Sequence, residues 1–198
     1  MRRAIPATLA AAVVLIPTVA LAHAGHGDTS GLVHGFTHPI TGIDHVLAMV
    51  AVGVLATQFS CPALWLIPLS FIGVMTVGGA LGIARLPLPF AELGVTLSVV
   101  VLGLAIAFPF RSQMLAAMAL VGLFALFHGH AHGAEMPAAA SALYYTAGFI
   151  GATAVLHTTG IGLGLLFGPE AGWLGRRVVQ AGGSAIALFG TAILIGVF

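Results

Sequence analysis

The chain contains no lysine, and its six arginines and five acidic residues amount to only 6% of 198 residues. Because soluble domains carry charge on about a quarter of their residues, this composition excludes an ordinary soluble domain. The arginines are scattered and form no basic patch, which argues against nucleic acid as a partner. A single cysteine, Cys61, excludes an intramolecular disulfide, and we expect it to be structural in a reducing cytoplasmic turn.

Apolar residues dominate what is present, at 60% of the chain with a mean hydropathy of +1.14. We therefore predict an all-α, polytopic membrane protein, in which residues 41–198 form a six-helix transmembrane bundle surrounded by the lipid bilayer. Short connections predict that successive helices are antiparallel neighbours. The six apolar segments are 41–59, 63–84, 92–109, 113–133, 139–168 and 172–198, with prolines at or between their ends.

The N-terminus has the three parts of a secretory signal peptide, which we place at residues 1–22. Two arginines precede a short apolar stretch and a small-residue cleavage site, and an uncleaved first helix is the alternative. Cleavage would leave residues 23–40 as a periplasmic segment, glycine-rich and expected to be mobile until Phe36. His23 and His26 in this segment are weaker metal-binding candidates, and a plain solvated linker is equally compatible with them.

Arginines in the connections predict the orientation, because cytoplasmic loops carry the excess of positive charge. With the mature N-terminus in the periplasm, Arg111, Arg176 and Arg177 fall inside and Arg85 falls outside. This arrangement places all the polar motifs described below on the outer side of the inner membrane. Small residues four apart predict close helix packing at Gly78 and Gly82, Gly129 and Gly133, and Gly160 and Gly164.

The first polar motif, HPITGIDH, runs from His38 to His45 at the start of the first apolar segment. Seven positions separate the two histidines, so they share a face if one helix includes both. Asp44 is a candidate ligand or a partner that fixes an imidazole tautomer, and Met49 continues the stripe. Thr37 as a cap and Pro39 in a first turn predict that the helix starts here. The alternative is structural, with end caps and an interhelical bond.

The second polar motif, FHGHAHGAE, spans residues 127–135 and places His128, His132 and Glu135 along one helix face. His130 is expected to point away from that face and is a weaker candidate. Two imidazoles and a carboxylate suit a divalent first-row metal such as nickel, cobalt or zinc without selecting among them. A histidine run wetted by the headgroup region is the alternative.

Glu92 and His157 are further candidates outside the two motifs. Glu92 opens the third segment on the outer side of the membrane. It is a candidate ligand, or a negative charge at the entrance to the site, and the alternative is that it complements the helix dipole. His157 lies deep in the fifth segment, where a relay below the outer site and a hydrogen-bonded core histidine are both compatible with its position. Phe71 is interpreted as packing.

The chain resembles the HupE/UreJ family in three features, namely the signal peptide, the run from His38 to Met49 and the run from Phe127 to Glu135. These are small bacterial inner-membrane proteins associated with hydrogenase and urease gene clusters and regarded as nickel permeases. The resemblance covers essentially the whole mature chain and implies nickel as the cargo, although some relatives are thought to carry cobalt. It implies metal-handling roles for His38, Asp44, His45, Glu92, His128, His132 and Glu135.

The expected function is a secondary permease that takes up nickel(II), with cobalt(II) as the alternative, from the periplasm. The competing hypothesis is a membrane protein that binds metal for hydrogenase or urease maturation without transporting it. An enzyme is not expected, because the chain lacks the H-E-x-x-H pattern of a metal-dependent hydrolase, and no organic cofactor is expected. The oligomeric state and the coupling ion do not follow from the sequence.

Overall fold

A computed structural model describes residues 28–108, 113–168 and 172–197 of the chain, which fold into α-helices joined by short connections. The predicted signal peptide, His23, His26 and Arg111 lie outside these residues. The helices in the described residues are α1 (Asp28–Thr41), α2 (Ile43–Ala56), α3 (Ala63–Ile83), α4 (Ala91–Ala107), α5 (Met114–Ala134), α6 (Ala142–Phe167) and α7 (Gly172–Leu194).

Four of these helices, α3, α5, α6 and α7, are long and apolar enough to cross a membrane. The pair α1 and α2 passes the same test together as one bent span, and α4 is a shorter apolar helix of 17 residues. The chain is therefore an all-helical, multi-pass membrane protein. Each of the six apolar segments corresponds to one helix from α2 to α7, whereas α1 is an addition that the sequence did not predict.

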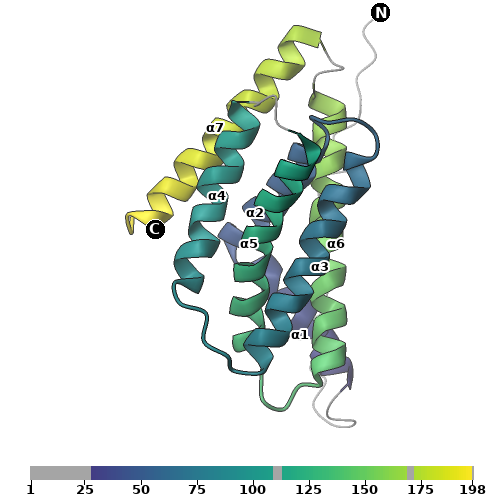
Figure 1. Cartoon of the computed structure of the whole chain (residues 1–198), viewed down its shortest axis with the longest axis vertical. Helices are drawn as coiled ribbons and strands as arrows, with labels where there is room; N and C mark the ends of the chain where they lie inside the picture. Colours follow the sequence, from purple (N-terminus) through teal and green to yellow (C-terminus); the bar gives the residue numbers. More distant parts are fainter. Residues whose placement is uncertain (1–27, 109–112, 169–171, 198) are drawn as a thin grey trace, which may run out of the picture.

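The expectation that successive helices would be close neighbours is wrong for the main packing pairs. The largest interfaces join α3 to α5, α4 to α7, and α6 to both α1 and α2. Figure 1 shows α4 and α7 side by side at one edge of the bundle. An apolar cluster between α2, α3, α4 and α5 fills the centre. Loop length limits the distance between consecutive helices, but complementary surfaces decide which helices pack.

The predicted glycine stripes are confirmed as sites of close helix approach. On α3, a Cβ atom at Gly78 would overlap the backbone oxygen of Leu126, and one at Gly82 would overlap that of His130. On α5, a Cβ at Gly129 would overlap the backbone oxygen of Met75. Such contact is needed because lipid provides no hydrophobic drive for helix association. The close packing of α3 on α5 sets the position along the helix axis of the α5 turns that carry the histidines.

A Gly78→Ala substitution should lower the melting temperature of the detergent-purified protein, because the added methyl group must separate α3 from α5. Overpacking of this kind costs about 1–3 kcal/mol. Gly73→Ala on the same helix is the matched control, since a Cβ there meets nothing within 4 Å. It should leave the melting temperature unchanged or raise it, because alanine favours helix over glycine by about 1 kcal/mol. Equal melting temperatures for the two variants would contradict the packing role.

The junction between α1 and α2 corrects the prediction that one helix starts at the first motif. The helix axes bend by 85° between residues 31–41 and 43–56. Pro39 lies inside the last turn of α1, where it cannot donate a backbone hydrogen bond, and Thr41 Oγ1 donates to the carbonyl of His38 at 2.7 Å. Gly42, in an extended conformation, precedes α2. His38 and His45 therefore belong to different helices and share no helix face.

Candidate metal site

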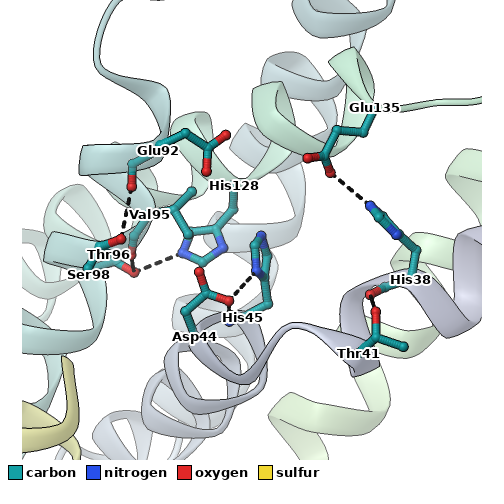
Figure 2. A network of polar contacts seen from close by, with 10 residues as sticks. All are labelled: His38, Thr41, Asp44, His45, Glu92, Val95, Thr96, Ser98, His128 and Glu135. Atoms are coloured by element: carbon teal, nitrogen blue, oxygen red, sulfur yellow. Dashed lines mark hydrogen bonds and ion pairs between the residues drawn. The ribbon is translucent and has the colours of Figure 1, made fainter. Parts of the chain in front are cut away.

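The outer part of the site joins the end of α1 to the end of α5. His38 Nε2 lies 2.8 Å from Glu135 Oε2 across these helices (Figure 2). The His132 ring, buried on α5, meets the His38 ring edge-on with centroids 4.9 Å apart. One ligand atom from each of His38, His132 and Glu135 can be chosen so that all three lie within 4.8 Å of one another. This group spans from the partly exposed imidazole of His38 to the buried imidazole of His132.

The Asp44–His45 pair in the first turn of α2 continues the site inward. Asp44 Oδ1 accepts the backbone N–H of His45 and lies 2.8 Å from its Nδ1. Because a carboxylate accepts, the neutral form of the His45 ring has its proton on Nδ1 and its lone pair on Nε2. That Nε2 is buried and has no hydrogen-bond partner within the described residues. Asp44 thus accepts the backbone N–H of the next residue in the first turn of α2 and also sets the His45 tautomer.

His128 on α5 is the most deeply buried imidazole of this group, with no exposed surface. Ser98 of α4 donates its hydroxyl proton to the carbonyl of Val95 at 2.6 Å, and its oxygen lies 2.8 Å from His128 Nε2. Since the serine proton is already used, the serine oxygen accepts and His128 Nε2 donates. The lone pair of His128 is therefore on Nδ1, which is buried without a partner in the described part of the chain. Figure 2 shows this ring between Ser98 and the Asp44–His45 pair.

Ring contacts join these groups into one row of imidazoles. The centroid of His132 lies 4.1 Å from that of His45, and the centroid of His45 lies 4.8 Å from that of His128. We call His38, His132, His45 and His128 the histidine row. Neither ring nitrogen of His132 has a hydrogen-bond partner among the described residues. A buried polar atom without a partner costs about 1–3 kcal/mol. Neutral imidazole lone pairs beside two carboxylates are a donor set that fits a divalent first-row metal.

Comparison with known proteins identifies the family of the chain. The family model described as HupE / UreJ protein matches residues 11–193. The chain belongs to the HupE/UreJ family. It is 45% identical over 193 residues to Protein HupE of Rhizobium leguminosarum bv. viciae, and the match covers 97% of each chain. No solved structure matches the chain.

In this HupE/UreJ protein the remaining candidates take different places. Glu92 is exposed in the first turn of α4, the helix that also carries Ser98 (Figure 2), and its backbone carbonyl accepts a bond from Thr96. His130 points away from the row, as expected, and its Nε2 donates to the carbonyl of Leu86 at 2.7 Å. Met49 is buried in the apolar cluster. The fold therefore brings six of the seven main candidates into contact with one another. The seventh, Glu92, is exposed in the first turn of α4.

Three residues with a place in this HupE/UreJ site did not stand out in the sequence. Ser98 resembles any other helical serine until its contact with His128 is seen. His34 stacks on His38 with centroids 5.5 Å apart. Its i, i+4 spacing from His38 is the signal that could have identified it, had residues 28–41 been predicted as a helix. Phe71, interpreted as packing, is fully buried and in contact with the rings of both His128 and His157.

Proposed function

We propose that this protein is a secondary permease that carries nickel(II), with cobalt(II) as the alternative cargo, into the cell across the inner membrane. The observation that carries the proposal is the histidine row, in which four imidazoles in successive ring contact run from a partly exposed to a fully buried position. The family's association with hydrogenase and urease gene clusters supports nickel, and links the protein to supply of those enzymes.

The row is suited to passing an ion inward in steps. Entry of a hydrated dication requires negative charge. Glu135 provides it beside His38 at the exposed end of the row, and Asp44 provides it beside His45 in the buried half. Glu92, exposed at the start of α4, adds a further carboxylate. His132 is in ring contact with His38 on the outer side and with His45 on the inner side, so it can exchange the ion between them. A small number of nitrogen and oxygen ligands selects a transition metal while still allowing it to leave.

The proposed topology has six spans, with α1 and α2 together forming a single broken span and α4 crossing at the lower limit of length. Broken helices within a membrane occur where the exposed backbone lines a site, which matches the position of Gly42 beside Asp44. Arg176 and Arg177 lie in the first turns of α7. That helix begins at the end of the bundle opposite to the one where α5 ends (Figure 1). By the positive-inside rule, the outer group of the row then faces the periplasm, following removal of a signal peptide.

Transport is distinguished from mere metal holding by liposomes that contain only the purified protein. With nickel(II) outside and a nickel-sensitive dye trapped inside, a permease should fill the lumen, whereas a binding or accessory protein should leave it empty. Protein-free liposomes control for leakage, and magnesium(II), which keeps its waters and prefers oxygen ligands, should not compete. If the protein binds nickel but the lumen stays empty, the permease hypothesis is wrong. The alternative, a metal-binding protein for hydrogenase or urease maturation, would then be favoured.

A further inference from the structure

His157 on α6 is a second buried site that the histidine row does not include. Its side chain is 2% exposed, and neither ring nitrogen has a hydrogen-bond partner among the described residues. Thr153, one turn earlier on α6, donates its hydroxyl to Met75 Sδ at 3.6 Å and is therefore not its partner. An ionisable side chain at such depth in a membrane protein is costly unless it serves a pathway.

Phe71 of α3 is the only described ring in contact with both His157 and the histidine row. Its centroid lies 5.7 Å from that of His128 and 5.1 Å from that of His157, and its side chain has no exposed surface. The backbone at His157 is held firmly, because a Cβ at Gly53 of α2 would overlap the His157 carbonyl oxygen. Both imidazoles therefore contact the same aromatic ring, which joins His157 to the inner end of the histidine row.

We propose that His157 is an inner metal position, which receives the divalent transition-metal ion after Phe71 moves out of the way. The inference rests on the proposed transport function and extends the route beyond the histidine row. A neutral imidazole offers one lone pair, which suits transient binding rather than storage. Phe71 at rest then separates the outer and inner positions, and this separation prevents a continuous open path.

The test is the initial rate of nickel(II) entry into liposomes as a function of outside nickel, for wild type and His157→Leu. We expect the maximal rate to fall at least about tenfold, which corresponds to about 1.4 kcal/mol, while the half-saturating concentration changes little because the outer group is intact. The melting temperature should stay equal or rise, since leucine removes two unpartnered nitrogens. A core histidine with a purely structural role would instead lower the melting temperature and leave the rate per folded protein unchanged.

His157→Gln keeps a polar side chain of similar length. It tests the role of His157 if the leucine variant does not fold. It should show the same loss of maximal rate, with nickel binding in detergent retained. Thr158→Ala is the matched control, because Thr158 is exposed next to His157 and its hydroxyl donates to the Ala154 carbonyl of its own helix. A wild-type rate in either folded His157 variant would overturn the inner position. An absence of entry in wild type would instead overturn the transport function itself, and the inner position with it.

Discussion

His132→Ala should abolish nickel uptake by cells and weaken nickel binding to the purified protein by more than about 100-fold. Loss of a residue that merely supports a metal ligand typically costs about 10–100-fold in affinity, and His132 contributes more than support. It belongs to the outer group with His38 and Glu135, and its ring lies 4.1 Å from that of His45. Its removal therefore deletes an outer ligand and separates the outer from the inner half of the row. Radioactive nickel uptake and calorimetry measure the two effects.

His130→Ala is the matched control for this substitution, because it also removes a buried imidazole from the same helix. His130 bonds to the Leu86 carbonyl, outside the histidine row, so its loss should cost about 1 kcal/mol of stability and leave nickel affinity within about twofold. His45→Ala should behave like His132→Ala, since its Nε2 is one of the unpartnered buried nitrogens. Undiminished uptake in both the His45 and His132 variants would remove the proposed site.

Composition and periodicity were sufficient to predict the helical membrane class and the stretches that became α2 to α7. They predicted the close approach at Gly78 and Gly129 as well, because glycine spacing in an apolar helix has few other uses. The bend at Gly42 was missed, since a helix pattern interrupted by one glycine and one proline is compatible with a helix start. Residues 28–41 were missed as a helix because their polar, glycine-rich composition is typical of a linker.

Contacts between helices account for the rest of what the sequence did not reveal. The spacing of His128 and His132 predicted one face of α5, but not that α2 would place His45 in ring contact with both. No local pattern connects Ser98 to His128, 30 positions away, or Phe71 to His157. Such contacts depend on which helices pair, and the pairing of α3 with α5 and of α6 with α1 and α2 skips sequence neighbours.

Asp44→Asn should weaken nickel binding by about 10–100-fold, the range found when the partner of a metal-binding histidine is lost. The carboxylate is 2.8 Å from His45 Nδ1 and keeps the proton on that nitrogen, so that the Nε2 lone pair remains directed into the site. An asparagine can present its amide N–H to Nδ1 instead, which would move the imidazole proton to Nε2 and remove the lone pair. It also removes one negative charge that helps to hold a dication. Calorimetry with nickel(II) measures the loss.

A double-mutant cycle with His45→Ala separates these two contributions of Asp44. If Asp44 acts through the His45 tautomer, adding Asp44→Asn to His45→Ala should cause little further loss, because the imidazole that it orients is already absent. If Asp44 instead binds the ion or contributes chiefly by charge, the two losses should add. We expect the coupled result, since one Asp44 oxygen is already shared between the backbone N–H and the ring of His45. Full affinity in Asp44→Asn would show that neither contribution matters.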